Sequence, residues 1–131
     1  MNNLYQMDKP RARLYINENS SWLKTISNQT EEIPALEKLL AVKNIESNNN
    51  QSQQENTHFR NALLQQKEEM QQLNTALDLQ QQRLKNDAEK KTLYDIDALC
   101  SQDILRDKIK EIEKKFIELK CNFMKYVSTN I

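Results

Sequence analysis

Residues 105–126 read LRDKIKEIEKKFIELKCNFMKY. Large apolar side chains recur here at alternating intervals of four and three residues, a spacing that keeps one stripe of an α-helix turned toward a neighbouring helix. These apolar residues are Leu105, Ile109, Ile112, Phe116, Leu119, Phe123 and Tyr126. Charged residues fill the other positions, including pairs such as Glu111 and Lys115 that stabilise an exposed helix face. The stretch therefore predicts a long helix whose apolar seam another helix must cover.

A second seam with the same spacing lies in residues 57–86. Its positions are Phe59, Leu63, Gln66, Met70, Leu73, Leu77, Gln80 and Leu84. Gln66 and Gln80 are polar, and a polar residue in a seam lowers stability but restricts register and partner choice, because only some alignments satisfy its amide. This segment is predicted to be a coiled-coil helix.

A third seam predicts a helical segment over residues 19–45, with Asn19 or Ser20 as a helix cap. Its positions are Trp22, Ile26, Gln29, Ile33, Leu36 and Leu40. Pro34 follows Thr30-Glu-Glu-Ile33 and fits the first turn of a helix, so one kinked helix and two short helices in series both stay open. Trp22 is interpreted as a bulky cap on the end of the bundle, with a hot spot at a partner interface as the alternative.

The remaining segments are predicted to connect or precede these helices. Residues 1–18, with the basic run KPRAR at 9–13, are expected to form a flexible arm, or alternatively a docking peptide that contacts a nucleic acid or a microtubule. Residues 46–56 are predicted to form a polar linker, because they include no apolar side chain that a helix could bury. Residues 92–127 form the C-terminal helix, either continuous or broken near Cys100, where Ser101 offers a cap.

The composition agrees with an all-α fold of elongated helices, either a coiled coil or a helical hairpin, without a β-sheet. The chain has 131 residues, no glycine and two prolines, whereas sheets and barrels draw on glycine for their tight turns. Apolar residues make up 37% of the chain, which suits helices that bury stripes and present polar backs to solvent.

Charge and hydropathy exclude several binding classes. Lysine and arginine together equal aspartate and glutamate at 19 each, so no broad cationic field is available for DNA. Asp95, Asp97 and Asp103 precede the last seam, where a basic-zipper protein would carry cations. No apolar run is long enough to span a bilayer, and we expect no membrane insertion and an intracellular location in the cytoplasm or cytoskeleton. Cys100 and Cys121 are expected to be reduced, small buried residues.

The sequence offers little for catalysis, and we expect no enzyme activity, cofactor, metal or small-molecule substrate. Phosphate-binding loops need glycine, which is absent. His58 is the single histidine and is expected to be exposed to solvent. Asp95, Asp97, Asp103 and Asp107 cluster in sequence, but a carboxylate site in a helical bundle needs matching ligands from another helix.

We therefore expect a non-catalytic coiled-coil subunit of a larger assembly, whose seam residues from Phe59 to Leu84 and from Leu105 to Tyr126 bind other coiled-coil subunits. Hetero-oligomers are favoured over a homodimer, and the alternative is a self-associating helical-bundle scaffold or adaptor. In its length, missing glycine and heptads at 22–40 and 59–126, the chain is similar to small coiled-coil subunits of spindle and kinetochore assemblies of the augmin type, and to subunits of tethering complexes. This resemblance implies a mitotic, cytoskeletal role in which microtubules are contacted only through the complex or the basic N-terminal arm.

Overall fold

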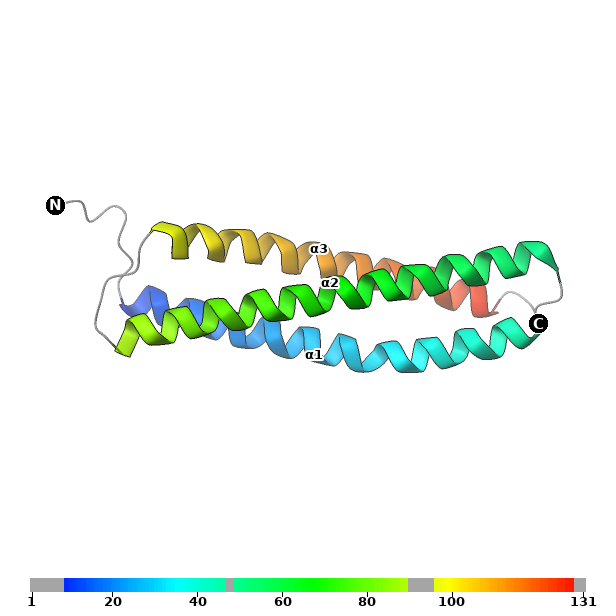
Figure 1. Cartoon of the computed structure of the whole chain (residues 1–131), viewed down its shortest axis with the longest axis horizontal. Coiled ribbons are helices and arrows are strands. Elements are labelled where there is room, and N and C mark those ends of the chain that lie inside the picture. Colours follow the sequence, from blue (N-terminus) through cyan, green and yellow to red (C-terminus); the bar gives the residue numbers. More distant parts are fainter. Residues whose placement is uncertain (1–8, 47–48, 90–95, 129–131) are drawn as a thin grey trace. The chain divides into compact units, whose positions relative to one another are not determined.

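The computed structural model describes residues 9–46, 49–89 and 96–128, and its regular structure over these ranges is entirely α-helical. Three helices follow one another: α1 (Lys9–Glu46), α2 (Asn50–Glu89) and α3 (Ile96–Ser128) (Figure 1). The predicted all-α class is confirmed, and no strand occurs in these ranges. None of the helices described has a stretch long and apolar enough to cross a membrane.

The chain divides into two compact units, and every helix contributes a segment to each. Unit 1 comprises Met1–Ile26 and Gln72–Lys110, and unit 2 comprises Ser27–Gln71 and Glu111–Ile131. Within each unit, the described segments of α1, α2 and α3 pack against one another, as the hydrogen bonds between them require. Each unit therefore has its own three-helix core.

The core of unit 1 combines apolar and polar side chains. Buried apolar residues of this unit are Ala12, Ile26, Leu73, Leu77, Leu84, Leu105 and Ile109. Asn19, Gln80, Gln81 and Gln102 are buried beside them. Because buried amides must find hydrogen-bond partners, this polar set fixes which residues of the three helices meet.

The core of unit 2 is more apolar and contains a cluster of aromatic rings. Its buried apolar residues are Ile33, Leu36, Leu40, Phe59, Leu63, Met70, Ile112, Phe116, Phe123 and Tyr126. The Phe59 ring stacks on Tyr126 at 5.0 Å between centroids and meets Phe123 edge-on at 5.6 Å. Tyr126 also donates its hydroxyl to the carbonyl oxygen of Ser52 at 3.2 Å, so this ring joins α3 to the first turn of α2.

Helix α1 begins earlier than predicted and does not stop at Pro34. It starts at Lys9, so the predicted flexible arm over 1–18 is wrong for residues 9–18, while residues 1–8 lie outside the described ranges. Ala12 is almost fully buried, and the carbonyl oxygen of Ile16 accepts a hydrogen bond from Gln81. Pro34 lies inside one continuous helix, because it removes a single backbone donor while Ile33 and its neighbours on the seam remain buried.

Helix α2 begins inside the predicted linker. Residues 46–56 were expected to lack regular structure, yet α2 starts at Asn50. Asn49 caps it, since its side-chain oxygen accepts a hydrogen bond from the Ser52 backbone at 2.7 Å. Asn56 is buried and donates to the carbonyl oxygen of Leu40 at 3.1 Å. Polar residues can therefore form the interior of a packed helix when another helix supplies their partners.

Helix α3 is continuous through Cys100, so the break that the sequence left open there does not occur. Ser101 lies inside the helix and not at a cap. Cys100 and Cys121 are both exposed, and the expectation that they are small buried residues was wrong, because both lie on the side of α3 away from its buried stripe. His58 is exposed, as predicted.

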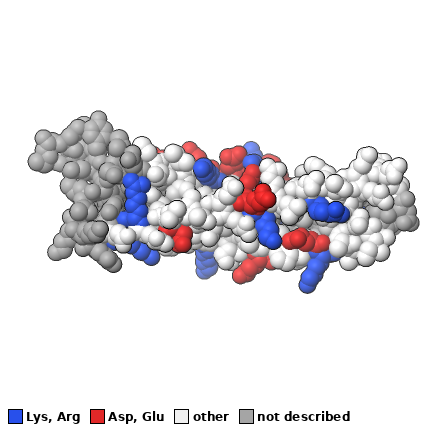
Figure 2. All heavy atoms as spheres, in the orientation of Figure 1, with Lys and Arg blue, Asp and Glu red and all other residues white. Residues whose placement is uncertain are grey.

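Charged side chains of both signs are interspersed on the face shown in Figure 2. Several charged side chains of the chain form ion pairs between helices, such as Lys120 with Glu32 at 3.0 Å and Lys115 with Glu69 at 3.7 Å in unit 2. These groups are partly exposed, so each pair contributes at most about 1 kcal/mol to stability.

Candidate functional site

The residues predicted to bind partner chains form the core of this chain. All of the apolar seam residues of α2 and α3 are buried except Leu119, which is half-buried. The buried seam residues are Phe59, Leu63, Met70, Leu73, Leu77, Leu84, Leu105, Ile109, Ile112, Phe116, Phe123 and Tyr126. The prediction that they form a partner-binding seam is corrected, because within each unit helices of the same chain already cover them. A heptad pattern identifies a buried face without saying which helix covers it.

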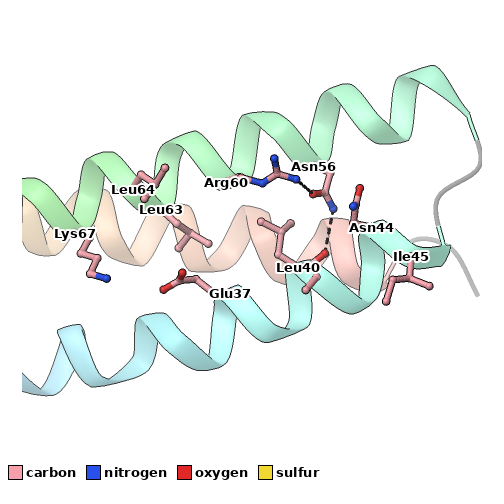
Figure 3. Close-up of a pocket in the computed structure, with 10 residues that line it drawn as sticks. Glu37, Leu40, Asn44, Ile45, Asn56, Arg60, Leu63, Leu64 and Lys67 are labelled. Atoms are coloured by element: carbon pink, nitrogen blue, oxygen red, sulfur yellow. Dashed lines mark hydrogen bonds between the residues drawn. The ribbon is translucent and has the colours of Figure 1, made fainter.

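A groove of about 500 Å³ lies in unit 2 between the second half of α1 and the first half of α2 (Figure 3). Its floor is formed by Leu40 and Leu63, which are buried, and its apolar walls by Ala41, Ile45 and Leu64. An apolar groove of this kind is a common binding site for an amphipathic helix of another protein.

Large apolar side chains that line this groove are exposed to solvent. Ile45 is 81% exposed and Leu64 is 52% exposed. Leu39 and Val42 on α1 are also exposed, but they do not line the groove. An exposed apolar area with a polar rim is typical of a protein-binding site.

Hydrogen-bonded polar residues lie at one end of the groove, and charged side chains line its length. Asn56 donates to the Leu40 carbonyl, and its side-chain oxygen accepts a hydrogen bond from Arg60 at 3.3 Å. Lys67 lies seven residues beyond Arg60 on the same wall, while Glu37 extends from the α1 wall (Figure 3). Neither Lys67 nor Glu37 forms an ion pair within the described part of the chain. The α2 wall is therefore cationic and available to a negatively charged ligand.

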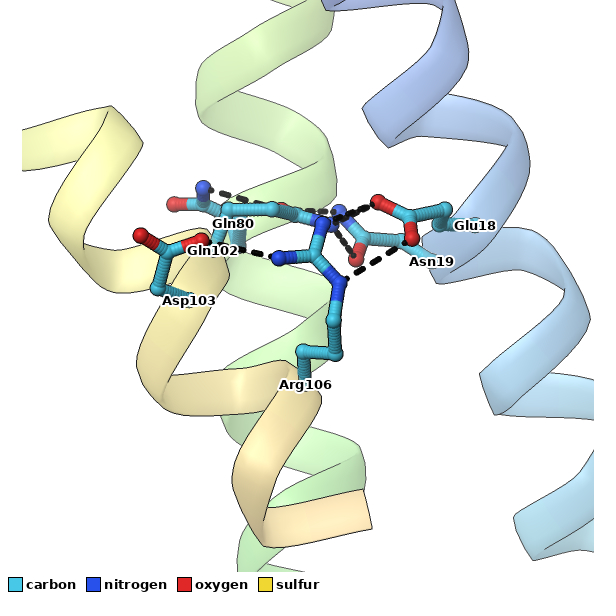
Figure 4. Close-up of polar contacts among 6 residues, drawn as sticks. All are labelled: Glu18, Asn19, Gln80, Gln102, Asp103 and Arg106. Carbon is cyan, nitrogen blue, oxygen red and sulfur yellow. Dashed lines mark hydrogen bonds and ion pairs between the residues drawn. The ribbon is translucent and has the colours of Figure 1, made fainter. Parts of the chain in front are cut away.

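Unit 1 contains a buried layer of amides to which each helix contributes one residue (Figure 4). Asn19 of α1 and Gln102 of α3 exchange two hydrogen bonds, at 3.2 and 2.8 Å, and Gln80 of α2 donates to Gln102 at 3.3 Å. Asn19 and Gln102 have no solvent exposure. The prediction that Asn19 caps a helix is wrong, because Asn19 lies inside α1 and its side chain bonds to α3.

An ion pair borders this amide layer. Arg106 donates to both carboxylate oxygens of Glu18, at 2.7 and 3.2 Å, and to Asp103 at 2.8 Å. The hydrogen bond to Glu18 raises the pKa of Arg106 above its usual value, although burial opposes this rise. The guanidinium group also lies 5.7 Å from the Tyr15 ring and 5.8 Å from the Trp22 ring. Trp22 thus lies half-buried inside α1 and contacts this ion pair, instead of capping the end of a bundle.

The two seam glutamines make the cross-helix contacts that their positions suggested. Gln66 donates to the carbonyl oxygen of Ile112 at 3.1 Å, and Gln80 bonds to Gln102. Their partners belong to α3 of this chain, so they specify the internal alignment of α2 and α3.

Sequence reasoning missed both the amide partner Gln102 and the groove. Gln102 lies three residues before Leu105 and Asn19 three residues before Trp22, so each continues the spacing of its seam by one position. Both were missed because each seam was counted from its first apolar residue. The groove has a weak signal, since Leu64 directly follows a seam leucine and Ile45 lies outside the first seam. Apolar residues outside a seam widen the apolar face beyond what one neighbouring helix can cover.

The described residues include no cluster of three or more histidine, cysteine, aspartate or glutamate side chains arranged to hold a metal ion. Comparison with known proteins finds no matching family, no similar curated protein and no similar solved structure. The candidate site is therefore defined by its geometry alone.

Proposed function

We propose that this chain is a non-catalytic protein-binding subunit that receives a helix of another protein in the groove between α1 and α2. The observation that carries this proposal is the groove of about 500 Å³ with Ile45 and Leu64 exposed at its walls. Leaving these side chains in water has a free-energy cost of about 25 cal/mol per Å² of apolar surface, which a partner would remove by covering them.

The proposal keeps the expected role of the chain in a larger assembly but changes the surface that performs it. The seams of α2 and α3 stabilise each unit internally, and the groove residues provide the contact with another protein. Membership of a cytoskeletal spindle complex, implied by the resemblance to augmin-type subunits, and a role as an adaptor in a tethering complex both remain predictions for which the groove is a compatible surface.

Site-specific photo-crosslinking in cells of the source organism tests this function. A benzophenone amino acid replaces Leu64 in one variant and Ile117 in a control variant, since Ile117 is similarly exposed, at 55% against 52%, but belongs to α3 and not to the groove. We expect a discrete crosslinked protein, identified by mass spectrometry, at position 64 and none at position 117.

A second step tests whether the captured protein binds through the groove. The identified protein is purified and mixed with the wild-type chain and with the double variant I45D/L64D, whose exposed positions tolerate a charge. We expect binding to the wild type and loss of binding to the variant, with helicity by circular dichroism unchanged. Equal crosslinking at positions 64 and 117, or full binding by I45D/L64D, would contradict the proposed function.

A further inference from the structure

We infer that the occupant of the groove is an amphipathic helix with acidic residues along one flank of its apolar stripe, spaced one heptad apart to pair with Arg60 and Lys67. This inference rests on the proposed function and names the chemistry of the partner.

The spacing of the charged residues on α2 indicates how the acidic residues of the partner are spaced. Arg60 and Lys67 are seven residues apart and both line the groove. Seven residues are close to two helical turns, so both side chains lie along the same edge of α2. A helix that runs along this edge presents its own flanking residues at the same interval, and this geometry matches the charge pairs that set partner choice in coiled coils.

The charges that line the groove indicate the sign of the charge on each flank of the partner helix. The groove is lined by two cations, on α2, and one anion, Glu37 on α1. A partner helix placed between the two walls meets the cations on one flank and Glu37 on the other. The complementary helix therefore carries glutamate or aspartate toward α2 and a neutral or basic residue toward α1, whereas a helix with lysine toward α2 is repelled.

Hydrogen bonding prepares Arg60 for this role. Its guanidinium donates to Asn56, which is 1% exposed and is itself bonded to the Leu40 carbonyl of α1. This contact uses one of the five N–H donors of Arg60 and leaves the others for a carboxylate. Holding a charged side chain at the rim before binding lowers the conformational entropy lost when a partner arrives.

The floor of the groove accepts the apolar stripe. Ala41 is exposed between Leu40 and Ile45, and its small side chain allows a partner helix to approach closely. Leu63 offers apolar contact from the floor and Leu64 from the opposite wall. The groove thus recognises the partner by its apolar stripe and by the charge on one flank.

Synthetic peptides of roughly three heptads test this chemistry directly. One peptide has leucine at both seam positions, glutamate on one flank and alanine on the other. A second peptide replaces the glutamates by lysines. Binding of each fluorescein-labelled peptide to the full chain is measured by fluorescence anisotropy at low ionic strength. We expect the glutamate peptide to bind roughly tenfold more tightly than the lysine peptide, the combined effect of two charge pairs and their reversal.

Charge-reversal variants locate the effect. In R60E/K67E we expect the preference to switch to the lysine peptide. The control K108E/K110E makes the same change in net charge at exposed positions of α3 outside the groove, and there we expect the glutamate preference to persist. K67E alone, which leaves the Asn56–Arg60 hydrogen bond intact, is expected to reduce the preference by about half on a logarithmic scale.

Several outcomes overturn the inference. These are equal affinity for the two peptides, an unchanged preference in R60E/K67E, or a groove-dependent dimer of the chain in sedimentation experiments that I45D/L64D abolishes. Failure of the proposed function is distinguished from failure of this inference by the crosslinking at Leu64. A crosslinked partner helix without acidic residues on its flank refutes the inference alone, and the absence of any crosslinked protein refutes both.

Discussion

At the residue scale, the most informative feature is that Asn19, Gln80 and Gln102 satisfy one another inside unit 1. Their hydrogen bonds contribute modestly to net stability, because the same amides would bond to water in the unfolded chain. Their larger effect is on alignment, since a shift of any helix along another would leave buried amides without partners. The layer therefore specifies one arrangement of the three segments.

Replacing one member of the layer is expected to cost more than replacing all three. Gln102→Leu removes the hydrogen bonds that buried Asn19 and Gln80 make to Gln102 and should lower the free energy of unfolding by about 1–3 kcal/mol. The triple variant N19L/Q80L/Q102L removes the three amides of the layer together and should recover most of this loss. Urea unfolding followed by circular dichroism measures both variants. A triple variant less stable than Q102L would contradict this account of the layer.

The ion pair beside the layer is expected to contribute less. The Arg106 and Glu18 side chains are 28% and 27% exposed, so solvent screens their attraction. Glu18→Gln should lower the free energy of unfolding by less than about 1 kcal/mol, and the difference from wild type should shrink as salt is added. Urea unfolding at two salt concentrations checks this, and a large loss that salt does not change would show that the pair acts as a buried one.

At the element scale, the ends and the interior of the helices depend on single residues. Asn49 satisfies a backbone donor at the start of α2 and turns a polar segment into a helix. Pro34 does the opposite inside α1, because proline has no backbone N–H to donate within the helix. The two positions therefore predict stability changes of opposite sign.

Loss of the cap should destabilise α2. Asn49→Ala removes the acceptor for the Ser52 amide, and we expect the free energy of unfolding to fall by about 1 kcal/mol. Asn50→Ala is the matched control, since Asn50 is an exposed residue of the first turn. Thermal unfolding compares the two variants, and equal melting temperatures would argue against Asn49 as the cap.

Removal of the interior proline should stabilise α1. Pro34 is exposed, so Pro34→Ala loses little packing while it restores a backbone donor, and we expect a gain of up to about 3 kcal/mol in the free energy of unfolding. Ala35→Pro, at the neighbouring exposed position, provides the reverse test and should lower stability. A Pro34→Ala variant that unfolds more easily than wild type would indicate that the proline itself stabilises the native helix.

At the scale of the whole molecule, every helix supplies a segment to both units. The apolar seams are therefore buried by folding, and the apolar residues that stay exposed lie outside the seams. In the proposed function, these exposed residues are the surface that contacts another protein. A disruptive change in a seam is expected to remove the fold, and a change in the groove is expected to remove binding while the fold persists.

Adjacent residues of α3 compare a seam position with an exposed position. Phe116 is fully buried and Ile117 is 55% exposed. Phe116→Asp places a charge in the core of unit 2, a cost of several kcal/mol that is comparable to the stability of a small domain, so we expect most of the helical signal to be lost. Ile117→Asp should leave circular dichroism and elution volume unchanged. Retained helicity in Phe116→Asp would remove the assignment of this seam to the core.

The sequence by itself determined the helical class and the buried face of each helix, because the alternation of four and three residues follows from the geometry of the helix and needs no knowledge of its neighbours. It also indicated the special role of Gln66 and Gln80. Only the tertiary structure decided that the chain covers its own seams, that α1 begins at Lys9, and that Asn19 and Gln102 bond to each other. The same holds for the pairing of Arg60 and Lys67 with an apolar groove. These properties depend on contacts between residues far apart in the chain. A local pattern predicts which face of a helix is buried, but it does not identify the helix that covers this face.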